Sequence, residues 1–161
     1  MARVPLVTLV ARDMQKPILL LVEDSEDDAF IFQWTFEKSG SPMGIHHVTD
    51  GAQAIEFLRN AAGPDSLPQI ILLDLKMPVL NGFDVLSWMR KQTFARPVPV
   101  VVVSGSAQEE DKTRAQELGA ADYLVKPVTV ADLHRIFGLT DTGLTDTGRG
   151  VAGRPETGVA V

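Results

Sequence analysis

The sequence contains no cysteine. This absence excludes disulfide bonds and cysteine-ligated zinc sites, and it suits a protein of the reducing cytoplasm. Long apolar runs are also missing, since none approaches the roughly 20 residues of a membrane-spanning helix. Basic residues are in the minority, with 15 Lys and Arg against 21 Asp and Glu and a net charge of −6. Without a basic stripe, we expect neither nucleic acid nor a membrane as a direct partner.

The apolar residues that are present follow a regular order along the chain. The 161 residues suffice for one domain, and 45% of them are hydrophobic, which is enough for a packed core. Segments rich in β-branched residues alternate with helix-like segments. The expected strands are 18–22, 45–49, 70–73, 98–103 and 122–125. Three of them are almost continuously apolar, as in parallel strands that are buried on both faces.

A helix-like segment follows each expected strand. Two of these helices begin with an N-cap residue and an acid three positions later, as in a capping box: Ser25 with Asp28, and Thr129 with Asp132. The other starts are expected at Gly51, Asn81-Gly82 and Ser106, and two ends at Gly40 and Gly119. Five successive strand-helix units predict an α/β fold with a five-stranded, parallel, doubly wound sheet.

The two ends of the chain lie outside this pattern. Residues 1–16 contain a short apolar run that Arg12 and Asp13 interrupt, and no small-residue cleavage site follows. We therefore expect an N-terminal extension rather than a signal peptide. Residues 138–161 are rich in Gly and Thr and contain "LTDTG" twice, which predicts a disordered tail. A segment that binds a partner is the alternative for this tail.

Polar residues stand where four of the expected strands end. Glu23 and Asp24 follow the first strand, Asp74 the third, Ser104 the fourth and Lys126 the fifth. Because parallel strands end at one edge of a sheet, all can face one crevice. Two carboxylates about 4 Å apart repel by roughly 4 kcal/mol at an effective dielectric constant near 20, so the crevice requires a cation. Lys126 supplies one charge, and oxygen ligands without His or Cys favour Mg²⁺ as another.

Four motifs carry a resemblance to a known family. They are "LLLVEDSEDD" at 19–28, "ILLDLKMPVLNGFDVL" at 71–86, "VVVVSGSA" at 100–107 and "GAADYLVKPV" at 119–128. In this order, and over about residues 16–137, they resemble the receiver domain of two-component response regulators. The stretches "GFDVLSWMRKQ" and "RPVPVVVVSGS" are similar to those of stand-alone regulators that are partnered with bacterial phytochromes.

The resemblance implies a receiver domain at 17–137 with a flavodoxin-like sheet of strand order 2-1-3-4-5 and five helices. It makes Asp74 the residue that accepts a phosphoryl group from the phosphohistidine of a sensor histidine kinase or a histidine phosphotransfer protein. Glu23, Asp24, Asp74 and the backbone carbonyl of Lys76 would hold Mg²⁺. Glu23 stands where the family more often has Asp, and the longer side chain suggests a water-mediated contact with the ion.

The resemblance also assigns the residues that respond to the phosphoryl group. Lys126 would pair with one phosphoryl oxygen, and its bond to Pro127 is cis in the family. The hydroxyl of Ser104, which replaces the commoner Thr, would bond another oxygen. Tyr123 would turn inward as Ser104 moves. Lys76 and Ser106 would border the crevice and influence how fast water removes the phosphoryl group.

No output domain is recognisable after residue 137. We therefore expect a single-domain regulator that signals by protein contact to a downstream target, and not an enzyme that acts on a separate substrate. On the first helix, Ile31, Phe32, Thr35 and Phe36 span about 140° and are expected against the sheet. Phe30 and Trp34 lie nearly opposite. We expect them to dock the kinase or a second copy of the chain, with burial under residues 1–17 as the alternative.

Three other classes of protein share features with this sequence. A haloacid-dehalogenase-like phosphatase needs a second Asp two positions after Asp74, where Lys76 stands. A nucleotide or flavin binder needs a glycine-rich loop where "VEDSEDD" stands. A receiver-like scaffold remains an alternative, which Mg²⁺-dependent binding of a phosphate analogue would distinguish. His46 and His47 point to opposite faces of a strand, so we expect no metal role for them.

Overall fold

The computed structural model describes residues 16–61 and 63–138. Five parallel strands form one sheet in the order β2-β1-β3-β4-β5. In chain order they are β1 (Ile18–Val22), β2 (Gly44–Val48), β3 (Ile70–Leu73), β4 (Val100–Ser104) and β5 (Asp122–Val125). This order confirms the predicted doubly wound, flavodoxin-like sheet.

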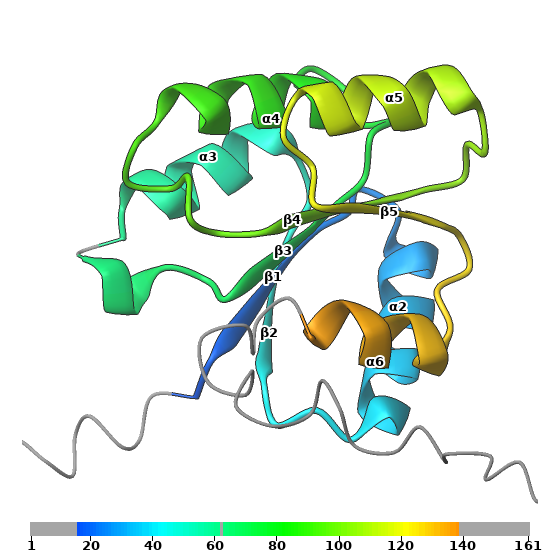
Figure 1. Ribbon diagram of the computed structural model, residues 1–161. Coiled ribbons are helices and arrows are strands. Elements are labelled where there is room, and N and C mark those ends of the chain that lie inside the picture. Colours follow the sequence, from blue (N-terminus) through cyan, green and yellow to red (C-terminus); the bar gives the residue numbers. More distant parts are fainter. Residues whose placement is uncertain (1–15, 62, 139–161) are drawn as a thin grey trace, which may run out of the picture.

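Five helices cover the two faces of the sheet (Figure 1). They are α2 (Glu26–Ser39), α3 (Gly51–Arg59), α4 (Gly82–Lys91), α5 (Glu109–Glu117) and α6 (Val130–Phe137), with a 3-10 turn, η1, at Pro64–Ser66. Helices α3, α4 and α5 lie on one face, while α2 and α6 lie on the other and contact each other. Among the described residues, no helix is both long enough and apolar enough to cross a bilayer.

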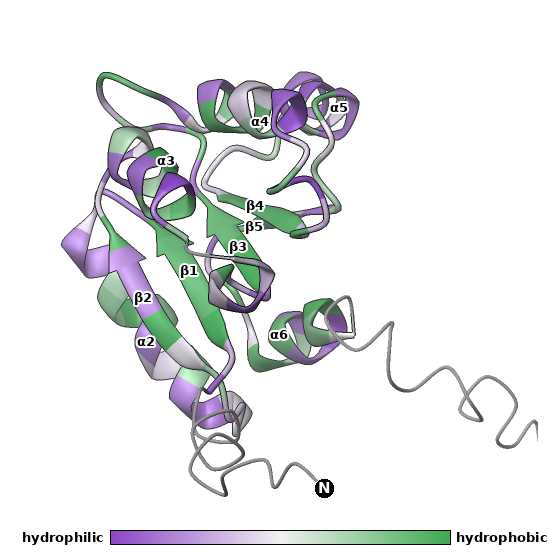
Figure 2. Cartoon of the chain, turned by 90° about the vertical axis from the view of Figure 1, so that its left-hand side faces the viewer, coloured by the Kyte–Doolittle hydropathy of each residue, from purple (hydrophilic) through white to green (hydrophobic). Residues whose placement is uncertain are grey.

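The sheet separates two hydrophobic cores. Successive residues of a strand point to opposite faces, so Leu20 and Val22 pack toward α3 and α4 while Leu19 and Leu21 pack toward α2 and α6. All four are at most 3% exposed. Figure 2 shows the central strands coloured as hydrophobic and the helices with hydrophilic and hydrophobic residues mixed. This burial on both faces explains why the central strands read as continuous apolar runs.

Two expected strand boundaries are corrected by the structure. The second strand is Gly44–Val48 rather than 45–49, and the fourth is Val100–Ser104 rather than 98–103. Pro99 has no backbone N–H to donate, and the N–H of Val98 donates back to the carbonyl of Ala95 at 3.2 Å, which explains the later start of β4. At its other end, Ser104 pairs with Val125 and is therefore the last residue of the strand.

The ends of the helices follow local signals with two exceptions. Gly40 and Gly119 have φ angles of 72° and 98° and stand where α2 and α5 end, as predicted. The start expected at Ser106 is wrong, because α5 begins at Glu109 with Gln108 as its N-cap residue, and the Ser106 hydroxyl donates to Asp111 in the first turn. The capping box predicted for Ser25 and Asp28 is half formed. Ser25 Oγ accepts the N–H of Asp28 at 3.2 Å, but the Asp28 side chain does not return the bond.

The predictions for the chain ends fall largely on residues 1–15 and 139–161, which lie outside the described residues. The extension, the tail and the covering of α2 by the N-terminal segment therefore stay predictions.

Candidate functional site

Three carboxylates meet at the edge of the sheet where the winding direction reverses. Glu23 and Asp24 follow β1, Asp74 follows the neighbouring β3, and one oxygen of each lies within 4.8 Å of the others. The backbone N–H groups of Asp74 and Glu23 still bond the adjacent strands, at 3.0 Å to Val22 and 3.1 Å to Val48. Glu23 and Asp74 are buried, and Asp24 is exposed. The crevice predicted from the strand ends is thus formed.

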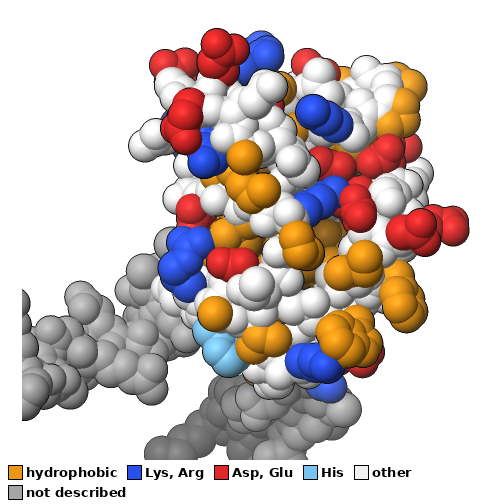
Figure 3. All heavy atoms as spheres, turned by 90° about the vertical axis from the view of Figure 1, so that its right-hand side faces the viewer, with side chains coloured by type: hydrophobic (Ala, Val, Ile, Leu, Met, Phe, Trp, Pro, Cys, Tyr) orange, Lys and Arg blue, Asp and Glu red, His pale blue; other side chains and the backbone are white. Residues whose placement is uncertain are grey.

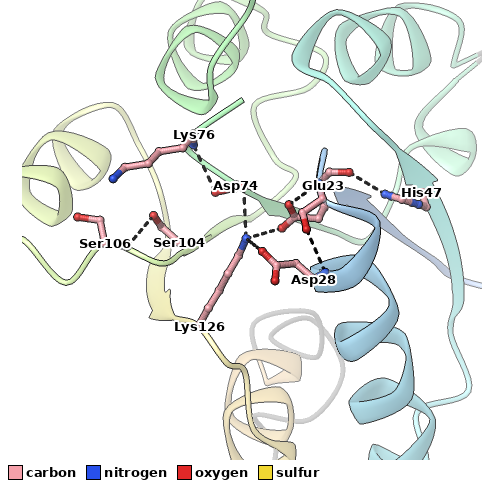
Figure 4. A network of polar contacts seen from close by, with 9 residues as sticks. Glu23, Asp28, His47, Asp74, Lys76, Ser104, Ser106 and Lys126 are labelled. Carbon is pink, nitrogen blue, oxygen red and sulfur yellow. Dashed lines mark hydrogen bonds and ion pairs between the residues drawn. The ribbon is translucent and has the colours of Figure 1, made fainter. Parts of the chain in front are cut away.

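Lys126 reaches this crevice from the loop between β5 and α6 (Figure 4). Its ammonium Nζ lies 2.6 Å from Glu23 Oε2, 2.8 Å from Asp28 Oδ2 and 3.3 Å from Asp74 Oδ2. The backbone N–H of Lys126 donates to the Ser104 carbonyl at 2.9 Å, and the following bond to Pro127 is cis. Asp28 is the partner that the sequence did not reveal, because we assigned its side chain to a helix cap.

The charges of the crevice are not balanced. Burial raises the pKa of Glu23 to about 7, and the nearby charge of Asp74 acts in the same direction, against the hydrogen bonds from Lys126 and Ser25. Burial lowers the pKa of Lys126, but the carboxylates of Asp28 and Glu23 outweigh it and hold this pKa above its ordinary value. The ammonium group therefore stays charged. Three acidic side chains bond the one ammonium group and Asp24 lies beside two of them, so the excess of acidic groups favours a further cation.

The donor set fits Mg²⁺. Glu23, Asp24 and Asp74 offer oxygen ligands close enough to share one ion, and Mg²⁺ prefers one or two carboxylates together with a carbonyl and water. The exposure of Asp24 leaves one side open to solvent. Lys76 is tied to the same place, because its N–H donates to Asp74 Oδ1 at 3.3 Å.

Hydrogen bonds connect Ser104 to Tyr123 through Ser106. Ser104 is fully buried, and its Oγ accepts the N–H of Ser106 at 3.1 Å. The carbonyl of Ser106 accepts the Tyr123 hydroxyl at 2.7 Å, and the Ser106 hydroxyl donates to Asp111 at 2.6 Å. The aromatic ring of Tyr123 packs against the core between the sheet and α3 to α5. Tyr123 is therefore already turned inward and is bonded to Ser106, in the segment that follows Ser104 at the end of β4.

A cavity of about 210 Å³ extends from the charged groups toward α2. Its charged lining is Glu23, Asp28, Asp74 and Lys126. Its other lining residues are Leu21, Val22, Ile31, Phe32, Leu72, Val103, Pro127 and Val128. The crevice thus joins the charged cluster to an apolar surface at the beginning of α2.

Helix α2 exposes three large apolar side chains, and two of them were predicted to face outward. Phe30 and Trp34 are 70% and 54% exposed, as predicted, and Lys38 Nζ lies 3.4 Å from the centroid of the Trp34 ring. Ile31, which we expected against the sheet, is 47% exposed, and Ala29 is buried instead. The buried stripe is rotated toward Ala29, which leaves Ile31 at the mouth of the cavity. Figure 3 shows the side of the molecule on which α2 lies, with hydrophobic side chains beside charged ones.

The two adjacent histidines have separate neighbours. His47 Nε2 lies 2.8 Å from the backbone carbonyl of Glu23, and His46 packs on Phe57 with ring centroids 4.4 Å apart. Neither belongs to the carboxylate cluster. The contact of His47 with the main chain of Glu23 was not predicted, because it depends on the pairing of β1 with β2.

Comparison with known proteins gives one family. The sequence model of the response regulator receiver domain matches residues 19–137. The probable methanogenesis regulatory protein FilR2 of Methanothrix harundinacea (strain 6Ac) is 38% identical over 119 residues, which are 73% of this chain and 77% of that protein. The phosphorylated cyanobacterial phytochrome response regulator RcpA aligns with a TM-score of 0.65 at 30% identity, over 81% of this chain and 96% of that one. The bacteriophytochrome response regulator RtBRR aligns with a TM-score of 0.69 at 34% identity, over 78% of each chain.

Proposed function

Because this chain belongs to the family of response regulator receiver domains, we propose that Asp74 accepts a phosphoryl group from the phosphohistidine of a sensor kinase or a histidine phosphotransfer protein. One observation carries the proposal. Asp74, the carboxylates of Glu23 and Asp24, and the ammonium group of Lys126 surround one crevice. The backbone of Asp74 is held by β1 through its N–H. A nucleophile on such a rigid support suits an in-line displacement.

The transfer is a displacement at phosphorus. An oxygen of the Asp74 carboxylate forms a bond to phosphorus while the bond from phosphorus to the donor's imidazole nitrogen breaks. The electron pair of that bond stays on the imidazole nitrogen, and Asp74 carries an acyl phosphate. Water later attacks phosphorus, which returns the carboxylate and releases inorganic phosphate. The protein thus promotes only its own phosphorylation and dephosphorylation.

The residues around Asp74 each stabilise one part of the transferred group. Glu23, Asp24, Asp74 and the carbonyl of Lys76 would hold Mg²⁺, which supplies positive charge for the phosphoryl oxygens. Lys126 donates to one oxygen, and the Ser104 hydroxyl turns toward another. When Ser104 Oγ moves, the bond from the N–H of Ser106 is released, and the Ser106 carbonyl that holds Tyr123 shifts with it.

We place this protein in the cytoplasm as a stand-alone regulator whose signal passes by protein contact. The absence of cysteine suits the reducing cytoplasm, and the similarity to RcpA, which is covered over 96% of its own chain, supports a stand-alone regulator. The similarity to RtBRR and RcpA supports a phytochrome as the sensor. Phe30 and Trp34 supply an exposed apolar surface on α2, the helix that borders the cavity, and such a kinase can dock there.

The test is chemical phosphorylation of the purified chain. With acetyl phosphate and Mg²⁺, intact mass spectrometry should show one added phosphoryl group that hydroxylamine removes. Asp74→Asn should abolish the addition, while Asp27→Asn on α2 should leave it unchanged. Equal phosphorylation of the Asp74→Asn protein would contradict the assignment. Beryllium fluoride serves as an analogue of the phosphoryl group. If it binds without Mg²⁺, or does not bind at all, the result would favour a receiver-like scaffold.

A further inference from the structure

Four helices in the described part of the chain carry an aspartate at the third helical position, and their side chains do not all make the same bonds. Asp111 in α5 accepts the hydroxyl of Ser106 at 2.6 Å and closes no capping box. Asp84 in α4 and Asp132 in α6 accept the N–H of their N-cap residues, at 3.1 and 3.0 Å, and so close a capping box. Asp28 in α2 has the same position behind its N-cap, Ser25. Its carboxylate instead lies 2.8 Å from Lys126 Nζ.

The side chain of Asp28 is free for this contact because another acid has taken its capping role. The N–H of Ser25 donates to Glu23 Oε1 at 3.0 Å. Glu23 therefore caps the helix with one oxygen and bonds Lys126 with the other, at 2.6 Å. The start of α2 and the position of Lys126 are held by one connected set of bonds.

The contact of Asp28 uses up the last donor of Lys126. An ammonium group has three N–H bonds, and here each has a carboxylate partner in Glu23, Asp28 or Asp74. A phosphoryl oxygen on Asp74 can bond Lys126 only if one partner leaves. The side chains of Glu23 and Asp74 are 5% and 7% exposed, whereas that of Asp28 is 42% exposed. If the ammonium group leaves, water can solvate the carboxylate of Asp28 at little cost in free energy, but it hardly reaches the carboxylate of Glu23.

We infer that Asp28 is a positioning residue for Lys126. In the unphosphorylated protein the Asp28 carboxylate holds the ammonium group of Lys126, and on phosphorylation it releases this group to a phosphoryl oxygen. This inference rests on the proposed function. Asp28 lies outside the group of carboxylates that can share one metal ion. It therefore competes with the phosphoryl group for Lys126 without competing for the metal. Its release also frees a negative charge on the first turn of α2, at the mouth of the cavity.

The test measures a phosphoryl analogue and the metal separately. Beryllium fluoride binding in the presence of saturating Mg²⁺, and Mg²⁺ binding alone, are followed by isothermal titration calorimetry. We expect Asp28→Asn to bind beryllium fluoride about two- to fivefold more tightly than the parent, since a partly exposed ion pair no longer competes. Asp28→Ala should shift the affinity in the same direction, and Asp28→Glu should restore the parent value. The affinity for Mg²⁺ alone should stay within about twofold.

Asp27→Asn is the matched control, because it removes one negative charge from the same turn of α2 at an exposed residue. Equal gains for Asp27→Asn and Asp28→Asn, or an equal gain for beryllium fluoride and Mg²⁺, would show a general charge effect and overturn the inference. Weaker binding by Asp28→Asn would also overturn it. If the parent itself fails to bind beryllium fluoride with Mg²⁺, the proposed function fails instead.

Discussion

At the scale of single residues, the crevice holds one positively charged group within a few ångströms of several acidic groups. Lys126 lies 2.6 to 3.3 Å from three carboxylates, and Asp24 adds a fourth acid at the open side. The ammonium group and a metal ion would therefore each neutralise part of the negative charge of the carboxylates, at different places. Lys126 faces the buried side, and the metal would lie where Asp24 meets solvent.

This division predicts different results for two substitutions. Lys126→Ala should keep or increase the affinity for Mg²⁺, because it removes a positive charge that repels the ion, yet it should lose the conformational response to phosphorylation. Asp24→Ala should lose Mg²⁺ binding, because it removes a ligand. Metal titration followed by tryptophan fluorescence measures both. Loss of Mg²⁺ binding in Lys126→Ala would contradict the division of roles.

Gly82 shows how closely the backbone approaches at the same site. A Cβ atom at this position would lie 2.4 Å from the carbonyl oxygen of Asp74 and 2.9 Å from the Cα of Leu75. We expect Gly82→Ala to lower the free energy of unfolding by about 1–3 kcal/mol and to slow labelling by acetyl phosphate, because the main chain of Asp74 must shift. Urea unfolding measures the first effect. Gly44→Ala, where a Cβ meets open space, is the control and should unfold at or above the parent midpoint.

At the scale of elements, α2 joins three features of the molecule. Its buried side covers one hydrophobic core, its first turn reaches Lys126, and its outer side carries exposed aromatic residues. Because the same helix borders the cavity, a partner that binds its outer side comes close to Asp74, the proposed site of phosphorylation. This arrangement suits a surface that positions a phosphodonor.

Replacing Phe30 and Trp34 together by Ser tests this surface. We expect the fold and the labelling by acetyl phosphate to be retained, since both side chains are exposed. Transfer from the sensor kinase should weaken by tenfold or more, because burying two aromatic side chains contributes several kcal/mol. Circular dichroism checks the fold, and rapid-quench kinetics measure the transfer. Phe94→Ser, at an exposed aromatic residue after α4, is the control.

Three outcomes would each change the account of α2. Unfolding of the double variant would show that the surface is covered in the folded protein, as residues 1–17 would do. Unchanged transfer would show that the kinase docks elsewhere. Loss of self-association, measured by analytical ultracentrifugation, would instead identify a second copy of the chain as the partner.

At the scale of the whole molecule, negative charge is concentrated at one edge of the sheet in a chain whose net charge is −6. Like charges held together by folding oppose the folded state, and a bound divalent cation relieves this repulsion. Metal binding should therefore stabilise the whole domain and not only the loops that contact the ion.

We expect Mg²⁺ at ten times its Kd to raise the free energy of unfolding by about 1.4 kcal/mol, because a ligand of the folded state shifts the equilibrium by mass action. Differential scanning calorimetry should show a rise of several degrees in Tm. NaCl at matched ionic strength is the control for screening, and Asp24→Ala should remove the rise. An equal rise with NaCl would contradict a specific metal site.

Much of this protein follows from local features of its sequence. The apolar runs, the glycine ends at Gly40 and Gly119 and the cap at Thr129 depend on neighbours within a few residues, so the element order and the parallel sheet were predictable. Because parallel strands end at one edge, the sequence also indicated that Asp74 and Lys126 meet. The tertiary structure alone decided that Asp28 bonds Lys126, 98 residues away, and leaves its cap to Glu23. It also decided the exposure of Ile31, because helical period defines a stripe but only packing against the sheet sets its rotation.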